Sequence, residues 1–273
     1  MSKRNNFFGS KSSYTARTLA FLAATGISDT TIANALNTMD LALIAAGLLP
    51  TGTGSGVMKA IYPFVGGTAT THKFNFVNPL DTDAAFRLTF AGGWTHSATG
   101  AKPNGTTGAA NSHYNPLAQG LTVNNIHISF YSRNGGLGGA DISAAALGAG
   151  NSLELFLKFS DASTYYGCND LITNGSHAST DGIGFYCTSR SGGTNKKLYK
   201  NGATENSIAF SPSQPSPPNE NIYLGVRNLT GVLSLYSQKQ CAFATIGTGL
   251  SDAQYTNLYN LIQAFQTSLS RQV

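Results

Sequence analysis

The side chains best suited to hold a ligand lie in one Gly-rich stretch, FAGGWTHSATGAKPNGTTGAANSHYN, at residues 90–115. It contains the only tryptophan, Trp94, together with His96, Asn104 and Tyr114. Saccharide sites commonly place an aromatic ring beside neutral hydrogen-bonding side chains, often on loops of a rigid sheet. These four residues are therefore the candidate glycan contacts. The alternative is that Trp94 closes one end of a hydrophobic core while the polar side chains face solvent.

Acidic side chains offer little for catalysis. Polysaccharide hydrolases need two carboxyl groups close together, one acting as acid and the other as base or nucleophile. Glu154 is the only acidic residue of its predicted strand, where Leu and Phe surround it. Asp81 and Asp83 have the spacing of two carboxylates on one face, but a turn explains them equally well. We expect no enzyme, and Asp81 and Asp83 are the one candidate pair for a calcium ion.

Other catalytic and cofactor motifs are missing from the sequence. The five histidines are scattered, and none has the i, i+4 spacing of a helical zinc site. Three cysteines without a CxxC pair indicate buried free thiols rather than a disulfide framework or a zinc site. There is no P-loop, dinucleotide fingerprint or nucleophile elbow, so we expect no cofactor. A Ser-His-Asp arrangement stays open, because serine occurs throughout the chain.

Composition restricts the partners. Only 11% of the 273 residues are charged, and glycine is abundant at 31 residues, so neutral polar groups must form most of the surface. Such surfaces are common in all-β proteins that work outside cells or inside assemblies. The net charge of +5 is spread too thinly to predict nucleic-acid binding. No apolar run approaches the roughly 20 residues of a membrane span, so we expect no membrane insertion.

The first fifty residues form a helical unit in this interpretation. Residues 1–14 are predicted to be an arm, and residues 15–25 a short helix that Gly26 ends. Ser28 is the predicted N-cap of a second helix, which runs to Gly47. A helical hairpin of this size cannot bury its apolar face alone and must pack on something else.

From residue 51 onward the apolar period changes from helical to two. Residues 48–56 are a Pro/Gly/Ser break, which we take as the boundary between domains 1–50 and 51–273. Asn201-Gly202 predicts a tight hairpin turn. Ser251 and Gln254 form a capping box that starts a final helix over 251–270. The pattern predicts a mainly β protein with a two-sheet antiparallel sandwich. The expected strands cover 59–65, 72–77, 86–93, 121–132, 152–160, 183–189, 196–200, 221–226 and 232–246.

Two long stretches carry a resemblance to a known group. MKAIYPFVGGTATTHKFNF…DTDAAFRLTFAGGWTHSATGAKPNG at 58–105 and CAFATIGTGLSDAQYTNLYNLIQAFQTSLSRQV at 241–273 resemble tailed-bacteriophage virion structural proteins. These proteins carry a concanavalin A-like lectin/glucanase (LamG-like) jelly roll. The resemblance covers about residues 15–273 and implies a jelly roll and a place on the virion, as a fibre, spike or capsid-surface protein. It brings no established catalytic set, and the missing carboxylate pair speaks against the glucanase branch.

The resemblance leads to a functional expectation. We expect a non-enzymatic virion structural protein whose residues 1–50 anchor it to other virion proteins or sister copies. Lys3, Arg4, Phe7 and Phe8 are the candidate anchoring residues. A homo-oligomer is expected, a trimer if the protein is a fibre, and host surface glycan is a further partner. The alternatives are a glycan-binding host adhesin and a polysaccharide depolymerase.

Overall fold

Two sheets lie face to face in the computed structural model, which describes residues 14–146, 152–170, 175–209 and 215–273. Sheet A has eight strands: β1 (Met58–Tyr62), β3 (Trp94–Ser97), β4 (Gly100–Pro103), β6 (Asn125–Ser132), β11 (Gly184–Ser191), β12 (Asn195–Lys200), β13 (Ala203–Ala209) and β17 (Cys241–Gly247). Sheet B has nine: β2 (Thr89–Ala91), β5 (Ala109–Asn111), β7 (Ile142–Ala145), β8 (Ser152–Phe156), β9 (Ser163–Asp170), β10 (Ser176–Ala178), β14 (Tyr223–Leu224), β15 (Arg227–Leu229) and β16 (Val232–Ser234). These named strands pair antiparallel, apart from one parallel contact between β15 and β7.

The first hydrophobic core fills the space between the sheets. Sheet A runs in the order β13-β12-β11-β6-β17-β4-β3 with β1 beside β17, and sheet B in the order β10-β9-β8-β7-β14-β5-β2. Ile126, Ile128 and Phe130 of β6 enter this core at alternate positions, as a pleated strand requires. Leu153 and Leu155 of β8 do the same from sheet B. The alternation therefore fixes which face of each sheet is internal.

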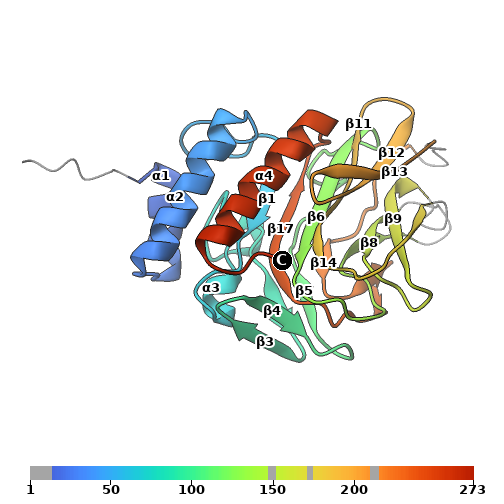
Figure 1. Ribbon diagram of the computed structural model, residues 1–273, viewed down its shortest axis with the longest axis horizontal. Coiled ribbons are helices and arrows are strands. Elements are labelled where there is room, and N and C mark those ends of the chain that lie inside the picture. The colour runs from blue at the N-terminus through green and yellow to red at the C-terminus, as the bar shows by residue number, and fades with distance from the viewer. Residues whose placement is uncertain (1–13, 147–151, 171–174, 210–214) are drawn as a thin grey trace, which may run out of the picture.

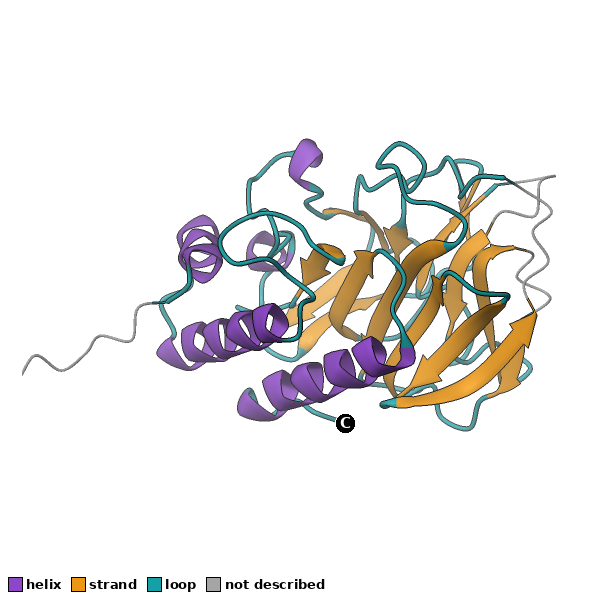
Figure 2. Cartoon of the chain, turned by 90° about the horizontal axis from the view of Figure 1, so that it is seen from above, coloured by secondary structure: helices purple, strands orange, loops and turns teal. Residues whose placement is uncertain are grey.

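Three helices cover the other face of sheet A and enclose a second core. They are α1 (Ala16–Thr25), α2 (Thr30–Ala45) and α4 (Asp252–Ser268), and they gather on one side of the strands (Figures 1 and 2). Leu36 of α2 and Ile262 of α4 pack with Tyr131, Phe185 and Phe243 from the sheet. The N-terminal hairpin and the C-terminal helix thus share one apolar layer. None of the helices that the structure describes is long and apolar enough to cross a membrane.

Two buried arginines tie this helical layer to the sandwich. Arg17 of α1 forms an ion pair with Asp40 and donates to carbonyl groups of the 50–54 loop. Arg271, which follows α4, donates to the carbonyl groups of Pro63 and Phe64 at 2.6 and 2.7 Å. Burial lowers the pKa of Arg271 to about 9, so its guanidinium is still charged at neutral pH. Charge-assisted hydrogen bonds of this kind fix the helices in one position on the sheet.

The structure confirms the predicted fold class, a mainly β two-sheet antiparallel sandwich with an N-terminal helical hairpin and a C-terminal helix. The capping box of α4 is present, with Ser251 and Gln254 bonded reciprocally. Asn201 and Gly202 both have positive φ, 48° and 88°, as a type I′ turn needs. The N-cap of α2 differs from the prediction. Asp29, and not Ser28, accepts the amides of the first turn, because the helix begins one residue later.

Three predicted strands are wrong. Residues 232–246 are not one strand: β16 ends at Ser234 in sheet B, and β17 begins at Cys241 in sheet A. Residues 72–77 are not a strand: a short helix, α3 (Ala69–His72), is followed by an irregular segment that runs along β1. The Asn75 amide oxygen accepts the Ile61 amide at 3.0 Å, so a side chain replaces the backbone pairing that a strand would give. Residues 86–93 form a strand only at β2, because a 3-10 helix (Asp83–Ala85) precedes it and Phe86 is left-handed, with φ 61°.

Candidate functional site

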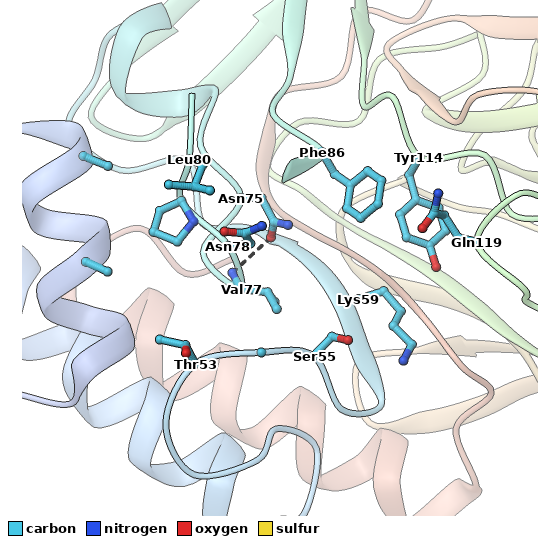
Figure 3. A pocket seen from close by; sticks show the side chains of 14 residues that line it. Thr53, Ser55, Lys59, Asn75, Val77, Asn78, Leu80, Phe86, Tyr114 and Gln119 are labelled. Carbon is cyan, nitrogen blue, oxygen red and sulfur yellow. Dashed lines mark hydrogen bonds between the residues drawn. The ribbon is translucent and has the colours of Figure 1, made fainter. Parts of the chain in front are cut away.

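The largest hollow described in the molecule lies where α1, the start of β1, residues 75–80 and the loop that begins at Tyr114 meet (Figure 3). Its volume is about 690 Å³, within the usual range for small-ligand pockets. We name it the Tyr114 hollow. It is lined by Ala20, Ala24, Thr53, Gly54, Ser55, Lys59, Asn75, Val77, Asn78, Pro79, Leu80, Phe86, Tyr114 and Gln119.

Two aromatic rings form one wall of the Tyr114 hollow. The Phe86 and Tyr114 ring centroids are 4.8 Å apart, in an edge-to-face arrangement. Both rings come from strained backbone: Phe86 itself has φ 61°, and His113, just before Tyr114, has φ 57°. A left-handed conformation is costly for a bulky side chain and persists only where the surroundings impose it. Here the Phe86 carbonyl accepts the Tyr62 hydroxyl at 2.7 Å, which holds the ring in place.

The polar side chains around the Tyr114 hollow fall into two groups. Asn75 is committed to the fold, because it accepts from the Ile61 and Val77 amides and donates to the Ala85 carbonyl. In contrast, the side chains of Lys59, Asn78 and Gln119 make no hydrogen bond to any residue that the structure describes. Figure 3 shows Lys59 on the same side of the view as Tyr114, with its amine end pointing away from the Tyr114 ring. These groups are free to bind a ligand.

Tyr114 adds a neutral hydroxyl to this set. Burial raises the pKa of Tyr114 above its usual value, so the phenol stays protonated at neutral pH. No Asp or Glu lines the Tyr114 hollow, and none lines the three other hollows described in the molecule. Phe86 is half-buried and Tyr114 is only 1% exposed, so the hollow offers a ligand part of the Phe86 ring beside hydrogen-bonding side chains. It offers no carboxyl pair for acid–base chemistry.

The structure places Trp94 and His96 elsewhere, in a group of contacting rings in which both side chains are half-buried. We name Trp94, His96, Phe90 and His72 the Trp94 cluster. The Phe90 ring lies 5.2 Å from Trp94 and 4.7 Å from His96, between ring centroids. Trp94 Nε1 donates to a backbone carbonyl at 3.2 Å, and His96 Nδ1 lies 2.9 Å from His72 Nδ1. The polar atoms of Trp94 and His96 that could meet a ligand are largely used within the protein.

Asn104, the third candidate, forms a turn. Its Oδ1 accepts the backbone amides of residues 106, 107 and 108 at 2.9–3.1 Å, and its Nδ2 donates to Thr107. Of the four candidates, Tyr114 alone lines the largest hollow. Their role as glycan contacts stays a prediction. Lys59, Phe86 and Gln119 were not predicted, and only Phe86, as the first apolar residue of the expected strand 86–93, carried any sequence signal.

Asp81 and Asp83 form a surface ion-pair network. Arg87 binds both carboxylates at 2.8 and 2.9 Å, and Lys73 binds Asp81 at 2.6 Å. His113 Nε2 lies 3.4 Å from Asp83. These cations neutralise the two carboxylates, and Lys73 and Arg87 hold the pKa of Asp81 below its usual value. Within the described ranges, no group of three His, Cys, Asp or Glu side chains could hold a metal.

The remaining predicted residues have structural places or lie outside the described residues. Glu154 is buried and accepts from Arg227 at 2.8 Å and from Ser143 at 2.7 Å, so it is held as an ion pair. The three cysteines are free and buried, as expected. Lys3, Arg4, Phe7 and Phe8 lie outside the described residues.

Comparisons with known proteins give likenesses of fold only. No family model matches the sequence, and no curated protein matches it. Domain 4 of an extracellular arabinanase from Geobacillus stearothermophilus, solved with arabinotriose, is 14% identical with a TM-score of 0.46, over 74% of this chain and 97% of that domain. A mutant Trypanosoma rangeli sialidase is 12% identical with a TM-score of 0.47, over 85% of this chain. The chain spans 38% of that sialidase.

Proposed function

We propose that this protein is a non-enzymatic structural protein of a bacteriophage virion whose jelly roll binds saccharide at the Tyr114 hollow. The observation that carries the binding function is the composition of that hollow. Two rings stand beside Lys59, Asn78 and Gln119, whose side chains have no hydrogen-bond partner among the described residues. Sugars present apolar C–H faces and many hydroxyl groups, so they need stacking surfaces and neutral donors and acceptors together.

A binding experiment tests this function directly. The full chain, displayed in many copies on beads, is applied to an array of bacterial surface polysaccharides, because multivalency compensates for weak single sites. Lys59→Gln and Gln119→Ala should each lower the signal, whereas Lys102→Gln, at an exposed lysine of β4 outside the hollow, should leave it unchanged. Binding to no glycan at high multivalency would contradict the proposal.

The same array separates the two candidate sites. If glycan binds at the Trp94 cluster, as the sequence suggests, Trp94→Phe should weaken the signal while Lys59→Gln should not. If it binds at the Tyr114 hollow, the ranking is reversed. Because Trp94→Phe keeps an aromatic ring against Phe90, it disturbs packing less than Trp94→Ala would.

A lack of catalysis is supported by where the carboxylates lie. Glycoside hydrolysis needs two carboxyl groups about 5–10 Å apart in a cleft. The acidic residues with the spacing for such a pair, Asp81 and Asp83, are neutralised by Arg87 and Lys73. Glu154 is buried under Arg227. Release of new reducing ends from host capsule by the purified protein would overturn this part of the proposal.

The place on a virion is supported by the sequence resemblance and by where its residues lie. The stretches 58–105 and 241–273 are far apart in sequence, yet β1 pairs with β17, and Arg271 donates to Phe64. The two stretches that carry the resemblance therefore pack against each other in the fold. Detection of the chain by mass spectrometry in purified particles of a phage that encodes it is the test. Its absence from particles would contradict a structural role.

Self-association completes the proposal. The exposed side of α1 is apolar, with Ala16, Leu19 and Ala23 facing solvent and Leu19 52% exposed. Virion appendages are assembled from symmetric copies, so we propose a homo-oligomer, a trimer if the protein is a fibre. Light scattering should show a multiple of the 28.5 kDa chain mass. The Leu19→Glu variant should reduce it toward that mass.

A further inference from the structure

A second hollow, distinct from the Tyr114 hollow, runs between α2 and α4. Its volume is about 440 Å³, and we name it the α2–α4 groove. Alanines on both helices create it, because their side chains are too short to fill the space between the helix axes. It is lined by Thr31, Asn34, Ala35, Thr38, Met39, Ala42, Leu261, Ala264, Phe265 and Ser268.

The chemistry of the α2–α4 groove favours an apolar, uncharged occupant. No charged side chain lines it. Met39 and Phe265 are each only 3% exposed and belong to the second core, so an occupant would extend that core. The groove is open to solvent along its rim, where Thr31, Asn34 and Thr38 are exposed. Filling the groove with side chains would recover apolar contacts that the helices alone leave unmade.

The described chain begins at the rim of this groove. The Tyr14 hydroxyl donates to Asn34 Oδ1 at 2.9 Å, and Asn34 lines the groove. The Thr15 amide donates to Asn37 Oδ1 at 2.8 Å on the same helix. Tyr14 is therefore held against α2, at the rim of the α2–α4 groove.

The sequence before Tyr14 contains a suitable apolar pair. Phe7 and Phe8 stand in an otherwise polar and basic stretch, MSKRNNFFGSKSS. The six steps from Phe8 to Tyr14 span up to roughly 20 Å when extended. From Thr31 to Ala42 the groove follows α2 for about 16 Å. The pair can thus reach any part of the groove from its own chain.

We propose that Phe7 and Phe8 bind in the α2–α4 groove of their own chain. The tether favours the same chain, because a short linker gives an effective concentration in the millimolar range. Each phenylalanine ring can bury about 150 Å² or more of surface against Met39, Phe265 and the alanines. The N-terminal segment would then complete the helical layer, whether or not the protein binds saccharide.

Disulfide trapping tests this contact in the full chain. Gly9→Cys places a thiol beside the intact phenylalanine pair, and Thr38→Cys places its partner at the exposed rim of the groove. The native cysteines are all buried, and burial raises the pKa of each thiol, so they will not compete. The control pair is Gly9→Cys with Val232→Cys, because Val232 is 64% exposed on a hairpin of sheet B.

The expected product is an intramolecular disulfide between positions 9 and 38, formed at least about tenfold faster than in the control pair because the site holds the segment close. Adding Phe7→Ser and Phe8→Ser to the same cysteine pair should lower the rate severalfold, because only the tether then keeps position 9 near the groove. Three results would overturn the proposal: the control rate with both phenylalanines present, a rate insensitive to the serines, or a disulfide found only between two chains.

Discussion

Aromatic rings form part of both the Trp94 cluster and the Tyr114 hollow. The two regions differ in whether the polar side chains beside the rings already have hydrogen-bond partners. In the Trp94 cluster, Trp94 Nε1 donates to a carbonyl group and the two histidines face each other at 2.9 Å. In the Tyr114 hollow, the side chains of Lys59, Asn78 and Gln119 have no partner among the described residues. The same kinds of residue therefore stabilise the fold in one region and remain available in the other.

The difference teaches that residue type alone does not separate a binding site from a packed corner. What separates them is whether the polar atoms around the rings already have partners. This gives a simple rule for the two regions. Changes in the Trp94 cluster should alter stability and leave the intrinsic binding of saccharide intact, and changes around the Tyr114 hollow should do the reverse.

The largest expected effect is on the Trp94 cluster. Trp94→Ala removes a ring that packs on Phe90 and His96 and against the backbone of Gly225. Unfolding in urea should show a loss of about 3 kcal/mol, as for large aromatic side chains replaced by alanine. Trp94→Phe should recover part of the loss. If Trp94→Ala is as stable as the parent and abolishes glycan binding, the two regions have exchanged roles.

Acid should also weaken the Trp94 cluster. Burial and the neighbouring His96 and Arg271 lower the pKa of His72 to about 3, and its buried Nε2 has no partner in the described part of the chain. Below pH 6.5 the unfolded chain therefore binds a proton on this histidine and the folded chain does not. The free energy of unfolding is thus highest above pH 6.5 and falls as the pH drops toward 3. When the pH is lowered from 7 to 5, this histidine should reduce the free energy of unfolding by about 2 kcal/mol.

Urea titrations at several pH values measure this loss. His127 on β6 contributes in the same direction, because burial lowers its pKa to about 4. His72→Phe isolates the Trp94 cluster, since it removes one titration and leaves the other. Between pH 6.5 and pH 4, the slope of the unfolding free energy against pH should be smaller in this variant than in the parent. The difference should correspond to about one proton. Parallel curves would show that His72 is not held neutral.

A smaller effect is expected at Asn104. Its Oδ1 accepts three backbone amides, so Asn104→Ala leaves these donors to water and should cost about 1 kcal/mol. Asn104→Asp keeps the acceptor and should retain most of the stability. Both variants should bind glycan as the parent does. Loss of binding in a fully folded Asn104→Asp would return Asn104 to the list of contacts.

The smallest effect on stability should come from the Tyr114 hollow. Lys59→Gln removes a side chain without a partner in the described residues, so the free energy of unfolding should stay within about 0.5 kcal/mol of the parent. Glycan affinity should fall about threefold to tenfold, because one charge-assisted hydrogen bond is lost. A stability loss larger than that of Asn104→Ala would show that Lys59 supports the fold.

The parts of the fold that the sequence predicted depend on local chemistry. The Ser251–Gln254 capping box and the Asn201-Gly202 turn each involve residues a few positions apart, and both are present. Residues 72–77 were wrongly predicted as a strand because Phe74 and Phe76 have the alternate spacing of a strand face. They are buried under the helices instead, and the Asn75 side chain makes the bonds of the missing ladder. No local pattern predicts that a side chain will replace backbone pairing.

The Tyr114 hollow was beyond sequence reasoning for a different reason. Its walls come from α1, β1, the segment after Phe76 and the loop around Tyr114, which are brought together by the packing of the helical layer. The left-handed backbone of Phe86, which turns its ring into the wall, has no sequence signature because Phe is not a residue that favours it. Tyr114 was predicted because it lies in the stretch 90–115. Trp94, His96 and Asn104 come from the same stretch but do not line the hollow.

The Asn75 amide has a consequence for crowding. It accepts the Ile61 amide, and the Phe76 amide donates to the Ile61 carbonyl at 2.8 Å, so the outer edge of β1 has its central backbone groups occupied. An open strand edge invites pairing with the same edge of a neighbouring molecule, and such pairing leads to aggregation. A neighbouring molecule that met this edge of β1 would therefore find no free central backbone groups with which to join the two sheets. Asn75 thus protects one edge of sheet A against intermolecular pairing.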